Sequence, residues 1–158
     1  MLLTQENDQR KAIMRKAVAL LALRERSRAE LVQKLSDFFS GTDSALIESV
    51  LDELESKKYL SDERFARVRL MLRSSRYGDR RLRDELRQSG ISESSIDSAF
   101  EDLKETEYER GKALWDRKFG EVAKDPKEKA KQFRFLASRG FSFRVINRIL
   151  ENQEDEEY

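Results

Sequence analysis

Three features of this sequence predict an all-α fold of three tandem three-helix repeats. The chain of 158 residues contains one proline and six glycines, so little interrupts its helices. Leu, Arg, Glu, Lys and Ala favour helices, and no segment alternates apolar and polar residues cleanly, as a half-buried strand would. A helical pattern also returns with a period of about 50 residues.

The first repeat is expected over residues 1–60. Ser27, with Glu30 three residues later, forms a capping-box pattern at the start of its second helix. Asp43 or Ser44 begins its third helix. The three apolar faces are predicted from Ile13, Ala17, Leu20, Leu21 and Leu23, from Leu31, Leu35 and Phe38, and from Ile47, Val50, Leu51 and Leu54.

The second repeat, 61–105, and the third, 106–150, follow the same plan. In the second, a long helix from about 62 to 75 leads into a turn at Tyr77-Gly78-Asp79, and a short helix then ends at Gly90. The second core is predicted from Phe65, Val68, Leu72, Leu82, Leu86, Ile96, Ala99, Phe100 and Leu103. The third is predicted from Leu114, Trp115, Phe119, Phe133, Leu136, Val145, Ile146, Ile149 and Leu150.

Equivalent residues recur at a constant spacing, which supports the repeat. Gly90-Ile91-Ser92 and Gly140-Phe141-Ser142 are 50 positions apart, as are Ile96 and Ile146. Three small units in a row form an elongated molecule in which each unit supports its neighbours. Residues 151–158 are predicted to form an acidic tail after the last unit.

Composition excludes several classes of function. With no cysteine and no histidine, the chain lacks thiol nucleophiles, Cys/His zinc sites and the Ser-His-Asp triad. It has no GxxxxGK[ST] or GxGxxG loop to hold a nucleotide. We therefore predict no enzyme, and no catalytic, cofactor-binding or metal-binding residues. The longest apolar run is too short to span a membrane and no signal-peptide pattern occurs, so we expect a soluble, cytoplasmic monomer.

The net charge of +1 hides blocks of opposite sign. Residues 64–87 hold nine arginines and three acids, and residues 93–109 hold seven acids and one lysine. Residues 110–148 hold twelve bases and four acids, and residues 151–157 hold five acids. The protein is not basic as a whole, so any anionic partner must meet one of the two basic blocks.

The arginines of the second repeat are the first candidates for partner binding. Six of them, from Arg69 to Arg87, recur every three or four residues, a spacing that forms a stripe on a helix. Three acids cannot pair nine arginines, and arginine suits forked contacts to carboxylate or phosphate. The alternative is a solvated face paired to nearby acids. The candidate residues are Arg69, Arg73, Arg76, Tyr77, Arg80, Arg81, Arg83 and Arg87, followed by Arg134, Arg139 and Arg144.

Most aromatic side chains are expected in the cores. Tyr59 is expected to pack at the junction of the first two repeats. Tyr77 lies beside Gly78 in a turn among arginines, and both a core position and an exposed contact stay open. The aromatic residues assigned to helix stripes, and so to the cores, are Phe38, Phe65, Phe100, Phe119, Phe133 and Trp115.

Nucleic-acid binding and protein binding both stay open at this point. Three-helix units with a turn resemble helix-turn-helix modules, so a stand-alone DNA-binding regulator is one alternative. The acidic blocks would repel phosphate, so direct DNA binding is expected to be modest and salt-sensitive. A surface with both signs suits a protein partner, or a protein already on DNA. An adaptor that joins proteins without nucleic acid is a further alternative.

Four parts of the chain resemble the RecX regulatory proteins of bacteria. They are ALLALRERSRAEL at 19–31, KYLSDERFA at 58–66, YG with RLRDEL and GI between 77 and 91, and FLASRGF at 135–141. The match runs from about Arg10 to Leu150. One departure is Asp79, where family members often carry proline after the turn glycine.

The resemblance implies three tandem three-helix repeats in an elongated, curved molecule, and a non-enzymatic modulator of the RecA recombinase. It implies binding to RecA and to its filament on single-stranded DNA, and inhibition of filament extension, ATP hydrolysis and strand exchange. These processes belong to homologous recombination, DNA repair and the SOS response. The rod would lie in the filament groove, with the candidate arginines against acidic patches of RecA or the DNA backbone. Contact with single-stranded DNA, direct or through RecA, would be weak.

Overall fold

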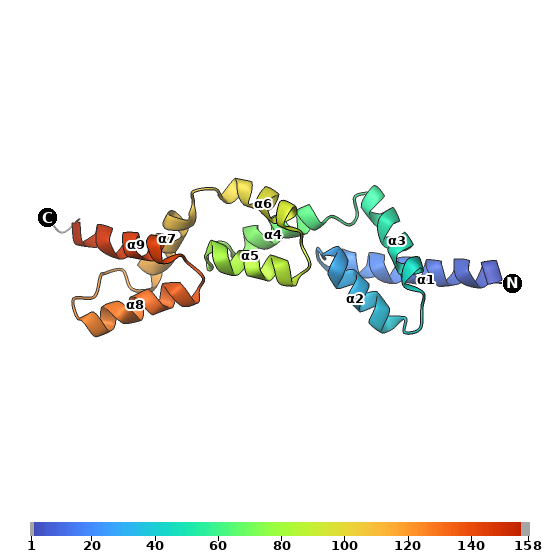
Figure 1. Ribbon diagram of the computed structural model, residues 1–158, viewed down its shortest axis with the longest axis horizontal. Helices are drawn as coiled ribbons and strands as arrows, with labels where there is room; N and C mark the ends of the chain where they lie inside the picture. The colour runs from blue at the N-terminus through green and yellow to red at the C-terminus, as the bar shows by residue number, and fades with distance from the viewer. Residues whose placement is uncertain (1, 156–158) are drawn as a thin grey trace.

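Nine α-helices and one short 3-10 helix make up the described part of the chain, and no strand occurs in it. The computed structural model describes residues 2–155, with the side chains of 3–151, so the end of the predicted acidic tail lies outside the described residues. The helices are α1 (Leu2–Leu23), α2 (Arg28–Phe38), α3 (Ser44–Ser56), α4 (Asp62–Arg73), α5 (Asp79–Gln88), α6 (Glu93–Phe100), η1 (Glu101–Leu103), α7 (Glu107–Lys118), α8 (Pro126–Ser138) and α9 (Phe143–Asp155). The prediction of an elongated, all-α repeat fold is confirmed (Figure 1).

Side-chain caps explain where several helices begin. The Ser27 hydroxyl accepts a hydrogen bond from the Glu30 N–H at 3.1 Å, and Ser61 caps α4 in the same way. Asp43 caps α3, which settles the choice between Asp43 and Ser44. Each cap satisfies an N–H group that the first turn of a helix leaves without a partner.

Three separate hydrophobic clusters form the core, one for each group of three helices. The first includes Ile13, Leu31 and Leu51, and the second includes Leu82. The third surrounds Trp115, whose ring N–H donates to the Gln132 side-chain oxygen at 3.1 Å. Where the chain would divide into units, at 60, 105 and 150, stays a prediction.

Some predicted core positions were wrong. Phe38 is 62% exposed because it lies in the last turn of α2, where its ring contacts Phe39 and Lys16. Leu72 is also 62% exposed, since α4 turns Leu70 to the core and Arg73 towards α5. Two more predicted apolar contacts, at Leu23 and Tyr59, are exposed.

The exposure of Tyr59 has a backbone cause. Lys58 adopts a left-handed conformation with φ of 62°. The turn that follows directs Leu60 into the first core, where it is 2% exposed, and leaves Tyr59 at 61%. Leu60 therefore occupies the place at the end of the first unit that Tyr59 was expected to fill.

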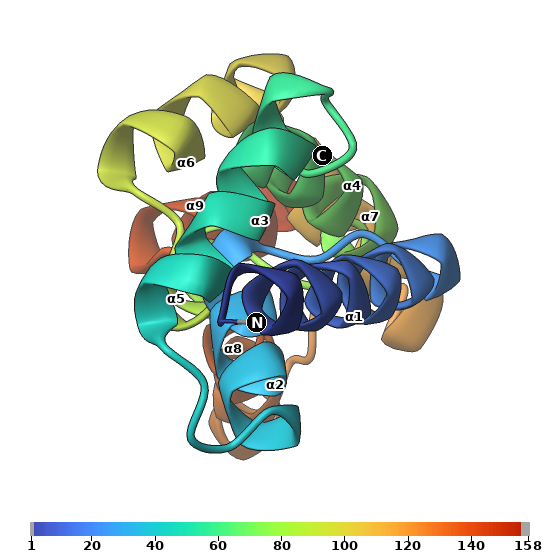
Figure 2. The same ribbon diagram turned by 90° about the vertical axis from the view of Figure 1, so that its right-hand side faces the viewer.

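The second helices of the three units, α8, α5 and α2, meet end to end along one side of the molecule (Figure 1). The Gly78 N–H at the start of α5 donates to the Arg139 carbonyl at the end of α8, at 2.8 Å. The Ser27 hydroxyl at the start of α2 donates to the Ser89 carbonyl at the end of α5, at 2.7 Å. In a view along the rod, α2 and α8 fall one behind the other (Figure 2). The positive end of one helix dipole thus meets the negative end of the next.

Glycines permit both end-to-end contacts. Gly140, after α8, has φ of 89°, and a Cβ there would lie 2.4 Å from the Arg81 Cβ. Gly90, after α5, has φ of 82°, and a Cβ there would lie 2.4 Å from the Ala29 Cβ. The same close approach therefore occurs at both junctions, and no side chain fits into it.

Arg110 reinforces the junction between the second and third units. Its guanidinium donates to the carbonyls of Ser74 and Tyr77 at 2.9 and 3.0 Å, and it pairs with Asp79. Arg64 does the same at the first junction, donating to the carbonyls of Lys58 and Tyr59. The Arg110 side chain is only 11% exposed. These charged hydrogen bonds to backbone carbonyls hold each unit against the one before it.

The junction can be tested with three glycine substitutions that separate steric clash from backbone strain. Gly78→Ala has an ordinary φ, but its Cβ would lie 2.4 Å from the backbone of Gly140. We expect a loss of about 2 kcal/mol in the free energy of unfolding from overpacking. Gly41→Ala is the control, because its φ is 85° and nothing lies within 4 Å, so it should cost about 1 kcal/mol.

Gly140→Ala combines both effects and should cost about 3 kcal/mol. Urea unfolding followed by far-ultraviolet circular dichroism measures all three. A Gly78→Ala variant as stable as the wild type would show that the two helix ends do not touch in solution.

Candidate partner-binding surface

The candidate arginines of the second unit do not form one stripe. Arg69 and Arg73 lie on α4, Arg76 and Tyr77 lie in the turn that follows, and the other four lie on α5. The turn ends the regular helical spacing between the two sets. The arginines divide into a cluster around Tyr77, a network between α5 and α6, and a free pair.

Tyr77 lies at the centre of the first group. The guanidiniums of Arg81 and Arg73 lie 4.1 and 4.5 Å from its ring centre, and that of Arg139 lies 5.3 Å away. The ring is half-buried, so Tyr77 belongs neither fully to the core nor to the open surface. Arg139 comes from the end of α8, so its cation–π contact crosses the junction between the second and third units.

A single carboxylate holds the cluster together. Glu85 accepts two hydrogen bonds from Arg73, at 2.7 and 2.8 Å, and lies 3.5 Å from Arg81 and 3.9 Å from Arg69. Burial opposes its ionisation, but the Arg73 hydrogen bonds and the charges of Arg73 and Arg69 outweigh burial, so the pKa of Glu85 lies below its ordinary value. One partly buried anion thus anchors three arginines.

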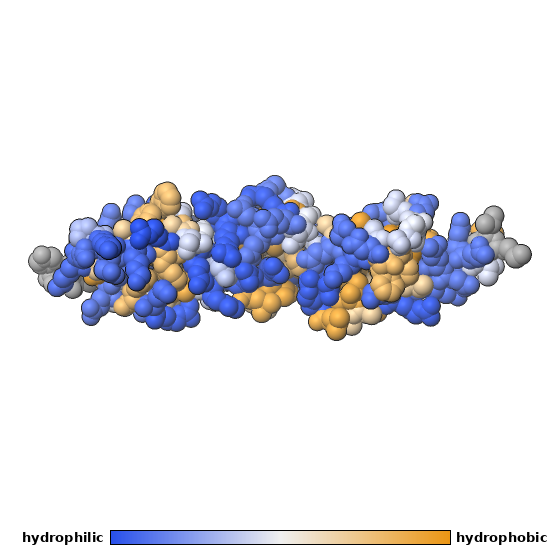
Figure 3. All heavy atoms as spheres, turned by 90° about the horizontal axis from the view of Figure 1, so that it is seen from below, coloured by the Kyte–Doolittle hydropathy of each residue, from blue (hydrophilic) through white to orange (hydrophobic). Residues whose placement is uncertain are grey.

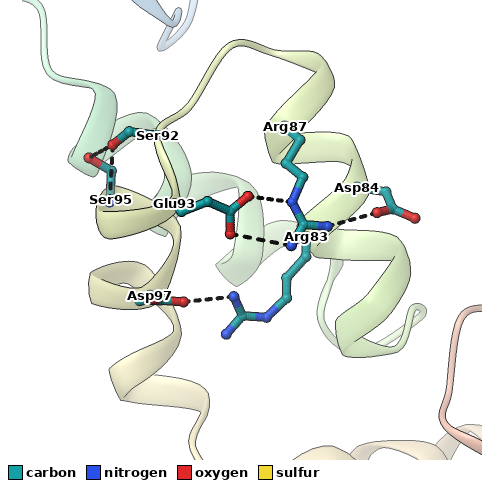
Figure 4. A network of polar contacts seen from close by, with 7 residues as sticks. All are labelled: Arg83, Asp84, Arg87, Ser92, Glu93, Ser95 and Asp97. Carbon is teal, nitrogen blue, oxygen red and sulfur yellow. Dashed lines mark hydrogen bonds and ion pairs between the residues drawn. The ribbon is translucent and has the colours of Figure 1, made fainter.

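Arg83 and Arg87 are paired to α6 (Figure 4). Arg83 donates to Asp97 at 2.8 Å and lies over the Phe100 ring. Arg87 bridges Glu93 at the start of α6 and Asp84 on its own helix. The hydrogen bond from Arg87 lowers the pKa of Glu93. This network ties α5 to α6.

The expectation that the arginines lack acidic partners was therefore wrong. The acids between 64 and 87 are too few, but Glu93 and Asp97 come from the next helix and Glu85 serves three arginines at once. Among the side chains described, Arg76 and Arg80 have no ion pair or hydrogen bond, and both are exposed. They are the candidates of this unit that are free to meet a partner.

In the third unit most of the candidate arginines are unpaired. Arg134 and Arg144 are exposed and have no ion pair to a described side chain, whereas Arg139 belongs to the Tyr77 cluster. Lys127 and Lys131 on α8 are also exposed and unpaired within the described residues. Sequence reasoning missed these two lysines, although the count of twelve bases against four acids between 110 and 148 already pointed to this unit.

No group of three or more Cys, His, Asp or Glu side chains among the described residues is arranged to hold a metal ion. No helix in the described part of the chain is long and apolar enough to cross a membrane.

The chain can now be compared with known proteins. Residues 61–99 match the second three-helix domain of RecX, and residues 105–150 match its third. A "Regulatory protein RecX" of Leptothrix cholodnii is 42% identical over 135 residues, covering 85% of each chain. This chain belongs to the RecX family. A second relative of the same name, from Pseudomonas putida, is 40% identical over 149 residues, covering 93% of this chain and 94% of its own.

Solved structures agree with this assignment. A structure titled "Crystal structure of regulatory protein RecX" has a TM-score of 0.77 and 25% identity, covering 92% of this chain and 74% of its own. RecX from Lactobacillus salivarius has a TM-score of 0.78 over 94% of this chain and 98% of its own, and at 21% identity it supports the fold. The resemblance to the RecX family found in the sequence is confirmed. The family is one of regulatory proteins, as the names of these relatives state.

The division between structural and free arginines predicts unequal effects on stability. Arg83→Gln removes an ion pair and a cation–π contact and should lower the free energy of unfolding by about 1 kcal/mol. Arg80→Gln should change it by less than about 0.5 kcal/mol, because Arg80 contacts no acid among the described side chains. Urea unfolding of both variants measures the difference, and equal losses would contradict the division.

The lowered pKa of Glu85 predicts a pH dependence. A carboxylate with a lowered folded pKa stabilises the fold above its unfolded pKa, about 4.3, and this stabilisation is lost as the pH falls through the folded pKa. Glu85→Gln should cost about 2 kcal/mol at pH 7. It should also flatten the loss of stability between pH 5 and pH 3, measured by urea unfolding.

The control for this variant is Asp102→Asn, which changes an exposed carboxylate outside the cluster. It should leave both the stability at pH 7 and the slope of the pH profile close to those of the wild type. A Glu85→Gln variant with the pH profile of the wild type would remove Glu85 as the anchor.

Proposed function

We propose that this protein binds the RecA recombinase and its filament on single-stranded DNA, and that it restrains filament extension, ATP hydrolysis and strand exchange. The observation that carries the proposal is membership of the RecX family, whose members named above are regulatory proteins. We expect it to act as a monomer in the cytoplasm, without catalysis.

The rod shape supports an action on a filament. The row of α8, α5 and α2 is about 50 Å long, from the lengths of the three helices and a rise of 1.5 Å per residue. A rod of this length is long enough to touch more than one subunit of a polymer. The contacts between helix ends hold the three units together, so a partner would meet them as one body.

The free bases are the contact residues in this proposal. Arg76 and Arg80 would meet acidic patches of RecA or the DNA backbone first, with Arg134 and Arg144 in the next unit. The paired candidates Arg69, Arg73, Arg81, Arg83, Arg87 and Arg139 would act mainly by holding Tyr77 and α5 in place. Glu93 and Asp97 of the acidic block 93–109 are paired with Arg87 and Arg83, which reduces the repulsion that these two acids would exert on an anionic partner.

The test is RecA ATP hydrolysis on single-stranded DNA, with this protein titrated in. We expect strong slowing at far less than one copy per RecA, because a rod that blocks subunit addition acts on many subunits at once. Absence of slowing, even at an excess of the protein and at low salt, would contradict the proposal. It would favour a stand-alone DNA-binding regulator or an adaptor.

The residue assignment has its own variant. Arg76→Glu with Arg80→Glu should raise the concentration needed for half-maximal slowing at least 10-fold, while helicity stays unchanged, because neither side chain supports the fold. Lys11→Glu with Arg15→Glu makes the same charge change on exposed positions of α1 and is the control. Equal slowing by the two double variants would remove Arg76 and Arg80 from the contact surface.

A further inference from the structure

Three helices begin at the junction between the second and third units (Figure 1). Arg110, in the first turn of α7, pairs with Asp79, the first residue of α5. Glu107, the first residue of α7, accepts a hydrogen bond from the Ser142 N–H, just before α9, at 2.9 Å. The starts of α5, α7 and α9 therefore meet around two carboxyl groups and one guanidinium.

The two carboxyl groups are in contact. Glu107 is half-buried, and its carboxyl is within hydrogen-bonding reach of the carboxyl of Asp79. A hydrogen bond between two carboxyl groups needs a proton on one of them, because an ionised carboxylate can only accept. Arg110 donates to Asp79 and to the carbonyls of Ser74 and Tyr77. One cation therefore serves two acids and two carbonyls.

This environment favours a proton on Glu107. Burial raises the pKa of Glu107, and the neighbouring Asp79 raises it further. The hydrogen bond from Ser142 and the charge of Arg110 lower the pKa but do not offset the other two effects. The pKa of Glu107 therefore lies above its ordinary value, whereas that of Glu85 lies below it.

The other arginines that reach this junction are engaged with aromatic rings. The guanidinium of Arg148 on α9 lies 4.0 Å from the ring centre of Tyr108, and that of Arg139 lies 5.3 Å from the ring centre of Tyr77. On the face of the rod seen from below, hydrophilic residues lie between separate hydrophobic areas (Figure 3). Since the second and third cores are separate as well, the junction relies on polar contacts, and these respond to protonation.

The first junction has the same arrangement without the like charges. There the carboxylate of Asp62, the first residue of α4, accepts a hydrogen bond from the N–H of Arg28, the first residue of α2, at 2.8 Å. Arg28 and Asp79 are 51 positions apart, and each begins the second helix of its unit. The position that is basic beside Asp62 is thus acidic beside Glu107.

We propose that Glu107 and Asp79 form a proton-operated joint between the second and third units, which tightens when Glu107 is protonated and loosens when it is ionised. A protonated Glu107 donates to Asp79 and still accepts from the Ser142 N–H. An ionised Glu107 places a second negative charge against Asp79 in a half-buried site. The inference goes beyond the proposed function, because it concerns the rod itself and holds for any partner.

The sign of the effect is opposite to that of Glu85. Because the folded pKa of Glu107 is raised, the stabilisation from its protonated form is fully present below the unfolded pKa, about 4.3. This stabilisation is lost as the pH rises through the folded pKa. The junction should therefore weaken as the solution becomes more alkaline.

The experiment follows two NMR signals of the full chain from about pH 4 to pH 8. The side-chain carboxyl carbon of Glu107 reports its ionisation, and hydrogen exchange of the Gly78 N–H reports the junction, because this group donates to the Arg139 carbonyl. We expect Glu107 to titrate at higher pH than the exposed Glu109. The protection of Gly78, corrected for the intrinsic exchange rate, should fall with the same midpoint. The Arg28 N–H at the first junction is the internal control and should keep its protection over that range.

The variant Glu107→Gln imitates the protonated acid, since its amide both donates and accepts. It should keep Gly78 protected at alkaline pH, and each unit by which the Glu107 pKa is raised should correspond to about a 10-fold difference in protection from the wild type. Glu109→Gln is the matched control and should behave as the wild type does. Asp79→Asn should lower the midpoint of the Glu107 titration.

Two results would overturn the inference. One is a Glu107 carboxyl that titrates together with Glu109 in the wild type, a measurement that needs no variant to fold. The other is a Gly78 protection profile that is the same in the wild type and in Glu107→Gln.

Discussion

The contact between the ends of α8, α5 and α2 is the constraint on which the rest of the structure depends. Each of the three cores is small, and among the described residues no core is shared between units. The units are aligned because the second helix of each unit begins against the end of the second helix of the next unit. Gly78 donates a hydrogen bond to the Arg139 carbonyl at one junction, and Ser27 donates to the Ser89 carbonyl at the other. A Cβ at Gly140 or Gly90 would prevent this approach, so two small residues determine the shape of the whole rod.

The same contact decides what the charged residues do. Because α8 meets α5, Arg139 reaches Tyr77 and Arg110 reaches the carbonyls of the turn before α5. These arginines are committed to the junction, and Glu85 commits three more. The charge left for a partner is therefore much smaller than the arginine count implies: among the candidates, only Arg76, Arg80, Arg134 and Arg144 are exposed and unpaired to a described side chain.

Periodicity and helix caps predicted the helices, the repeat and most of the core, and the family resemblance followed from residues in the same order and spacing. The failures have local causes. Phe38 and Leu72 fit an apolar stripe but lie at a helix end and beside the Arg73–Glu85 pair, and Tyr59 follows a left-handed Lys58. The pairing of the arginines could not be read from local charge counts, because the decisive acids, Glu93 and Asp97, come from a helix that only the fold brings alongside.

The most direct test of the account is the distance between spin labels on α2 and α8 by pulsed electron paramagnetic resonance. The chain has no cysteine, so Lys34→Cys and Lys131→Cys, both at exposed positions, give two unique labelling sites. If the helix ends hold the units in line, the labelled protein gives one narrow distance distribution, and adding Gly78→Ala broadens it. A broad distribution without that substitution would show units that move independently, and it would contradict the rod on which both proposals depend.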